Sequence, residues 1–153
     1  MKTLLTVSLL FASIIAIGQS SAETVTIGTN KLALTTDCKV DNDNKVSCGN
    51  NTVEWKYGDE QKVKGLQDAF LEMGGMLDRF KKKKIELYLF ETKVKGYKVS
   101  YKNATGTTYQ ISAAGVINGE PIWVLVSLDK EPVTNDDIPQ FVKQVVRFSE
   151  AKK

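Results

Sequence analysis

The stretch between residues 85 and 128 constrains the fold most, because it reads as four strands in a row separated only by turns. The two middle segments alternate along the strand, whereas the first and the last carry apolar side chains on both sides. Asn118-Gly119 is a strong signal for a two-residue hairpin turn, and Asn103–Gly106 is a second turn. Consecutive hairpins predict an antiparallel sheet. The four segments are residues 85–91, 94–102, 107–116 and 121–128.

Two helices are expected beside this sheet. Between Asp59 and about Lys82, apolar residues recur at spacings of three and four, which is the pattern of one helix face. Gly74-Gly75 interrupts this segment and predicts a kink or break. A second helix is expected from about Asn135 to Ala151, with Thr134 or Asn135 as its cap. The apolar face of the first helix comprises Val63, Leu66, Phe70, Met73, Leu77 and Phe80.

The segment 24–34 is expected to form one bent strand or a small hairpin, 38–48 a hairpin, and 52–57 a further strand. The order of strands, helix, strands, helix predicts one α+β domain over residues 23–153. We expect an antiparallel sheet of about five to seven strands packed by two amphipathic helices, one central and kinked and one C-terminal. The composition, 42% hydrophobic and 25% charged, is typical of a globular domain.

Residues 1–22 have the pattern of a cleaved signal peptide. Lys2 precedes an apolar stretch from Leu4 to Ile17, and small residues follow up to Ala22. This stretch is short for a membrane span, so we expect no transmembrane anchor. The prediction is a mature chain that begins at Glu23 and is periplasmic or secreted.

Cys38 and Cys48 are the only two cysteines, and in an exported chain they predict a disulfide. A hairpin centred on Asp43 places Val40 opposite Val46 and the two cysteines opposite each other. Closing so short a loop stabilises the fold by about 2–3 kcal/mol in the chain-entropy model.

The chain contains no histidine, which excludes Ser-His-Asp and Cys-His catalysis and any histidine-containing metal site. We therefore expect no enzyme activity, no cofactor and no metal. A carboxylate-based hydrolase is the remaining enzymatic alternative. Its candidate acids are Glu54, Glu86, Glu91 and Glu120.

The most conspicuous charged feature is Arg79 followed by Lys81, Lys82, Lys83 and Lys84. It indicates either a solvated helix end, where cations suit the helix dipole, or a surface for an anionic partner. An acidic loop, Asp129–Asp137, suggests that the surface charge is polarised. Nucleic acid is disfavoured because the chain is predicted to be exported and the basic run lacks interleaved aromatic residues.

Tyr97, Tyr101 and Tyr109 are expected on one sheet face. If the helices cover that face, these side chains belong to the core. If the face is open, it is a binding platform of the kind in which tyrosine dominates.

Together these features favour an exported, non-enzymatic binding protein, in its most concrete form a periplasmic inhibitor or immunity-type protein. It would act by stoichiometric contact with a protein partner, a toxin or a hydrolase, through the basic run and the tyrosines, and either the basic run or the acidic loop would steer the partner. The alternative is a carrier of a small apolar or lipid ligand held between sheet and helices. The predicted lining of that cavity is Phe70, Leu77, Tyr97, Tyr109 and Trp123.

Overall fold

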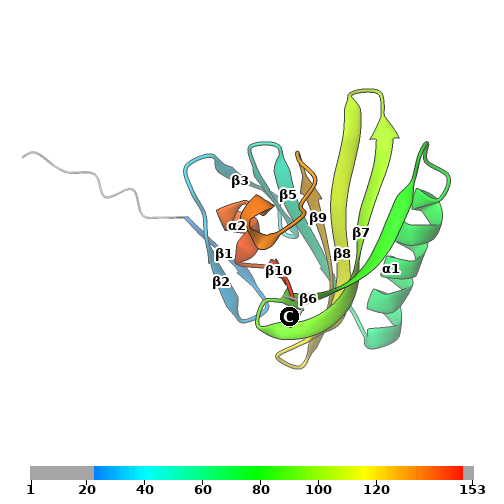
Figure 1. Cartoon of the computed structure of the whole chain (residues 1–153). Coiled ribbons are helices and arrows are strands. Elements are labelled where there is room, and N and C mark those ends of the chain that lie inside the picture. The colour runs from blue at the N-terminus through cyan, green and yellow to red at the C-terminus, as the bar shows by residue number, and fades with distance from the viewer. Residues whose placement is uncertain (1–22, 150–153) are drawn as a thin grey trace, which may run out of the picture.

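A computed structural model describes residues 23–149 and shows an antiparallel sheet of eight strands with a separate two-stranded hairpin (Figure 1). The strand order in the main sheet is β10-β6-β7-β8-β9-β5-β4-β3. The predicted signal peptide lies outside the described residues. The strands are β1 (Thr24–Ile27), β2 (Asn30–Ala33), β3 (Cys38–Asn42), β4 (Lys45–Cys48), β5 (Asn51–Tyr57), β6 (Lys81–Leu89), β7 (Thr92–Asn103), β8 (Gly106–Ile117), β9 (Glu120–Leu128) and β10 (Val146–Phe148).

The α+β class and the antiparallel sheet agree with the sequence prediction, but the number of strands and the roles of the helices do not. Within the described residues the main sheet has eight strands instead of about five to seven, and two more strands form a separate hairpin. The segment 24–34 forms the β1–β2 hairpin, one of its two predicted outcomes, and the segment 38–48 forms the predicted hairpin β3–β4. The strands from β6 to β9 follow one another as neighbours, as the turn signals predicted.

The main sheet has two unlike faces. Residues that pair directly across antiparallel strands point to the same side, and successive residues alternate. The inner face carries the apolar core, with Trp55, Ile111 and Val124 among its fully buried side chains. The outer face carries Trp123, which pairs with Lys56 on β5.

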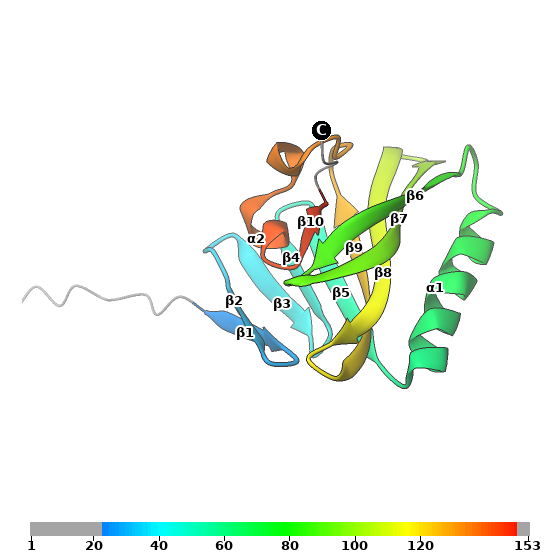
Figure 2. The same ribbon diagram turned by 60° about the horizontal axis from the view of Figure 1, so that its bottom comes forward.

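The inner face is covered by the β1–β2 hairpin and by the C-terminal segment, and Figures 1 and 2 show both on the side of the sheet opposite the long helix. These two segments are joined by Gln144, whose side-chain amide donates to the carbonyl of Ala33 and accepts from its N–H, each at 3.0 Å. The covering apolar residues are Ile27, Leu32, Leu34, Ile138, Phe141, Val142, Val145 and Val146.

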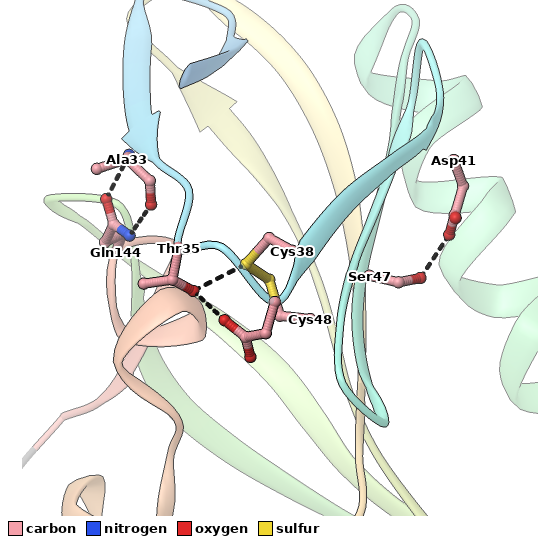
Figure 3. The surroundings of a disulfide bond; sticks show 8 residues. Ala33, Thr35, Cys38, Asp41, Ser47, Cys48 and Gln144 are labelled. Carbon is pink, nitrogen blue, oxygen red and sulfur yellow. Dashed lines mark hydrogen bonds between the residues drawn. A yellow bond between two sulfur atoms is a disulfide. The ribbon is translucent and has the colours of Figure 1, made fainter. Parts of the chain in front are cut away.

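The β3–β4 hairpin contains the predicted disulfide between Cys38 and Cys48 (Figure 3). The register is the predicted one, with Val40 opposite Val46 and the two cysteines opposite each other. A bulge near Asp41 lengthens the turn, and the Ser47 hydroxyl donates to the Asp41 carboxylate. The bond fits an extracellular or other oxidising environment.

The first helix, α1 (Glu60–Gly74), is shorter than the predicted segment 59–82. Asp59 caps its start by accepting the backbone N–H of Lys62 at 2.7 Å. It ends at the glycine pair, where a kink was one of the predicted outcomes, because two glycines weaken the helix and Phe80 folds back onto Gly74. A Cβ at position 74 would lie 2.4 Å from the Phe80 ring.

The predicted C-terminal helix from Asn135 to Ala151 is wrong over its described part. The chain forms a 3₁₀ turn, η1 (Asn135–Asp137), then the single turn α2 (Gln140–Lys143), and then β10. Pro139 explains the interruption, because proline lacks an N–H and holds the preceding Ile138 extended, at φ −86° and ψ 125°. Thr134 caps the 3₁₀ turn, with Asp137 completing a capping box.

Candidate functional site

The lysine run forms the start of strand β6 and not the end of a helix. Alternation along the strand therefore divides the four lysines between the two faces of the sheet. Lys82 and Lys84 lie on the outer face, where they pair with Val99 and Tyr97 of β7. Lys81 and Lys83 lie on the inner side. The sequence interpretation of one continuous basic patch is thereby corrected to two half-patches.

The outer half-patch coincides with two of the predicted tyrosines. Tyr97 lies directly between Lys84 on β6 and Ser112 on β8, and Tyr101 follows four residues later on the same side of β7. Both tyrosines are half-buried, and both lysines are exposed. We call this group the Tyr-Lys patch; its members are Lys82, Lys84, Tyr97 and Tyr101.

The long helix packs beside the Tyr-Lys patch, on the outer side of β8 and β9. Gln67 of α1 donates to the carbonyl oxygen of Ser112 at 3.1 Å, and both residues are buried. Phe70 packs at 6.1 Å, between ring centroids, against Trp123. The Trp123 indole in turn donates to the Ser112 hydroxyl at 2.9 Å. The helix thus covers part of the outer face, and Tyr97 lies on the strand next to Ser112, which the helix contacts.

The lysines of the Tyr-Lys patch make no ion pair with any carboxylate of residues 23–149. Farther along the same face, Lys93 is matched by Glu86, 2.7 Å away. A hydrogen bond and the charge of Lys93 lower the pKa of the Glu86 carboxyl, and the same contact raises the pKa of Lys93. Lys82 and Lys84 therefore keep their positive charge available to a partner.

The inner half-patch has a different environment. Lys83 lies opposite Lys98 of β7, and Lys98 is held by the Glu131 carboxylate at 2.9 Å and the Pro132 carbonyl at 3.2 Å. The acidic loop predicted to polarise the surface thus folds against one of these lysines. A surface hollow of about 560 Å³ opens here, with Lys83, Lys98 and Phe148 among its lining residues.

Arg79 is separate from both half-patches. It lies in the loop between α1 and β6 and adopts a positive φ of 53°, which is uncommon for a residue with a side chain. The loop is anchored to the end of β7, where the Lys102 N–H donates to the Asp78 carbonyl at 2.9 Å.

Tyr109 does not share a face with the other two tyrosines, so that prediction is wrong. It pairs with Ser100 of β7 and Leu128 of β9 and packs against the inner core. The reason is the two-residue turn Ala104-Thr105, which pairs odd-numbered residues of β7 with even-numbered residues of β8. Counting residues through this turn in the sequence would have predicted that Tyr109 and Tyr97 lie on opposite faces.

The five residues predicted to line a ligand cavity are likewise distributed over several surfaces. Trp123 and Phe70 meet on the outer side, Tyr109 is on the inner side, and Leu77 is 44% exposed in a loop. They do not line one cavity, so the carrier alternative stays a prediction without a located site.

The candidate carboxylates are also dispersed. Glu54 pairs with Lys56, Glu86 with Lys93, and Glu91 with Arg147. Glu120 begins β9. Across residues 23–149 no group of three or more histidine, cysteine or acidic side chains is arranged to hold a metal ion. No helix in this same range is long and apolar enough to cross a membrane.

Comparison with known proteins adds no assignment to this geometry. No family model matches the chain, and no curated protein resembles it significantly.

Proposed function

We propose that the mature chain is an exported binding protein of the inhibitor or immunity type, which contacts an acidic protein partner through the Tyr-Lys patch. It acts by stoichiometric occlusion, without turnover. The observation that carries the proposal is the juxtaposition of two unpaired lysines and two half-buried tyrosines on the outer face of β6 and β7.

The chemistry of the Tyr-Lys patch suits recognition of a protein surface. Tyrosine supplies large contact area with a polar tip, which is why it is enriched where proteins bind each other. Lysines without a carboxylate partner are costly to bury unless the partner provides one. The favoured partner therefore presents Asp or Glu side chains around an apolar centre, and opposite charges speed the encounter.

The proposed compartment rests on two observations. The predicted signal peptide directs export, and the disulfide of the β3–β4 hairpin persists only in an oxidising environment. A periplasmic or secreted toxin or hydrolase is the partner class that fits both.

Native mass spectrometry of the protein purified gently from its host's periplasm tests the proposal. A second protein at fixed stoichiometry is the expected result and identifies the partner. A bare monomer, with the same preparation showing no partner on cross-linking, would contradict the proposal.

Matched charge reversals then test the location. Lys82→Glu with Lys84→Glu is expected to weaken the complex by at least about tenfold, since two buried or rim charge pairs are reversed. Lys81→Glu with Lys83→Glu changes the net charge equally on the inner side and should have a much smaller effect. Equal loss in both variants would show that overall charge, and not the Tyr-Lys patch, determines binding.

A further inference from the structure

The last turn of α1 and the loop that joins it to β6 present an exposed apolar tip that the proposed protein contact does not use. Met73 is 62% exposed, Met76 81% and Leu77 44%. All three lie within five residues at the C-terminal end of α1. Large apolar side chains gathered in this way mark an interaction surface more often than single exposed ones do.

The tip is held in place. The N–H of Met76 donates to the Met73 carbonyl at 3.1 Å, and the N–H of Leu77 donates to the Gly74 carbonyl at 2.9 Å. Phe80 packs onto Gly74 beneath it, and the Asp78 carbonyl accepts from Lys102 of β7. The apolar side chains therefore belong to a turn that hydrogen bonds and packing hold in one conformation.

Cations outnumber acids along the chain next to the tip. Residues 72–84 contain five cations, Arg79 and the four lysines, against two acids, Glu72 and Asp78. Lys102 at the end of β7 adds a sixth cation, because both figures place the α1–β6 loop beside the β7–β8 hairpin (Figures 1 and 2). We call Arg79, Lys81 and Lys102 the cationic rim; none is ion-paired within the described chain.

We propose that this tip docks the protein reversibly on an anionic lipid surface. A protruding apolar tip fits the boundary between headgroups and acyl chains, which has no fixed shape to match, whereas a protein partner would have to supply a complementary pocket. Flexible unbranched methionines suit such a disordered environment. The cationic rim reaches the phosphate groups with its long side chains. This surface is distinct from the Tyr-Lys patch, so membrane docking would bring the bound partner to the bilayer.

Vesicle co-sedimentation of the processed protein tests the proposal. Binding is expected to vesicles that contain phosphatidylglycerol, to be much weaker with phosphatidylcholine alone, and to fall as salt is raised. Met76→Asp should lower the affinity for the anionic vesicles by at least about tenfold, because it places a charge where an apolar group is inserted. Arg79→Glu with Lys102→Glu should lower it as well.

Val133→Asp is the matched control, because Val133 is 72% exposed and lies on the loop after β9. It should bind the vesicles like the parent protein. Both substituted side chains are exposed, so thermal unfolding should be unchanged in the two variants. Absence of binding to the anionic vesicles overturns the proposal, and so does equal binding by the Met76 and Val133 variants. If Met76→Asp instead weakens the complex with the protein partner while vesicles are not bound, the tip contacts protein and the lipid proposal is wrong.

Discussion

The two faces of the main sheet bury their side chains in different ways. The inner face joins apolar residues from the sheet, the β1–β2 hairpin and the C-terminal segment into one cluster. The outer face receives a single helix, and only Val63, Gln67, Leu71 and Gly74 of α1 are buried there. The inner face therefore holds the fold together, whereas the outer face has less covering structure.

Polar groups make the outer contact weaker still. Gln110 of β8 is buried on this side and donates to Ser127 at 3.0 Å, but its carbonyl oxygen Oε1 has no hydrogen-bond partner among the described residues. The side-chain amide of Gln67 donates its hydrogen bond to the backbone carbonyl of Ser112. A contact with an unsatisfied polar atom gains less from burial than an apolar one. We therefore expect α1 to open more easily than the inner elements.

The largest expected effect comes from replacing the two tryptophans, one of which lies on each face of the sheet. Trp55 is 1% exposed in the inner core, and Trp55→Ala should lower the free energy of unfolding by about 3–5 kcal/mol. Trp123→Ala on the outer face should cost clearly less, because the ring packs on the single helix α1 and the main core stays intact, although the hydrogen bond to Ser112 is lost. Urea denaturation measures both values. Equal losses would contradict the difference between the faces.

The disulfide is expected to have the next largest effect. Replacing Cys38 and Cys48 together by serine should cost about 2–3 kcal/mol through the greater freedom of the unfolded chain. Denaturation of the double variant beside the oxidised parent measures the loss. The β3–β4 hairpin is at the edge of the sheet, so vesicle binding by the tip should be unaffected. An unchanged free energy of unfolding would show that the bridge is dispensable.

A smaller effect is expected from the helix itself. Leu71 lies on the buried side of α1 and is 7% exposed. Leu71→Ala should lower the free energy of unfolding by about 2 kcal/mol, at the lower end for a buried leucine. The loss should appear first as reduced helical circular dichroism, before the sheet unfolds. A single transition in which helix and sheet unfold together would argue against a separable helix.

The smallest effect concerns the unsatisfied amide. Gln110→Met keeps the length of the side chain and removes the unpaired oxygen, so stability should change by between zero and a gain of about 1 kcal/mol. Gln67→Met is the contrast, because it removes a hydrogen bond that is made, and it should destabilise. Thermal melts of the two variants separate these outcomes, and destabilisation by Gln110→Met would indicate that its oxygen has a partner.

Local signals in the sequence predicted much of this structure. Turn residues and alternation gave the order β6 to β9, and the spacing around Asp43 gave the cysteine register. The helical spacing of apolar residues gave wrong predictions where contacts with residues farther along the chain determine the local structure. Leu77 fits the apolar helix stripe, yet the helix stops at Gly74 because Phe80 folds back onto it. Similarly, Val146 begins strand β10 instead of continuing a helix, because β6 offers it an edge to pair with.

The candidate site was predicted in composition but not in arrangement. The lysines and tyrosines were identified by residue type, whereas their division between faces depends on where β6 begins and on the parity of the β7–β8 turn. A helix would have placed neighbouring lysines around a cylinder; a strand sends them alternately to opposite sides. The exposed tip was missed because Met73 and Leu77 were expected to be buried.

Hydrogen exchange of the free protein, followed by mass spectrometry, tests the division between the faces most directly. The account predicts that amides of α1 between Val63 and Leu71 exchange through a local opening of lower free energy than amides of β8 near Ile111, which require global unfolding. If the helix and β8 exchange with the same free energy, the outer contact is as strong as the inner one and the account is wrong.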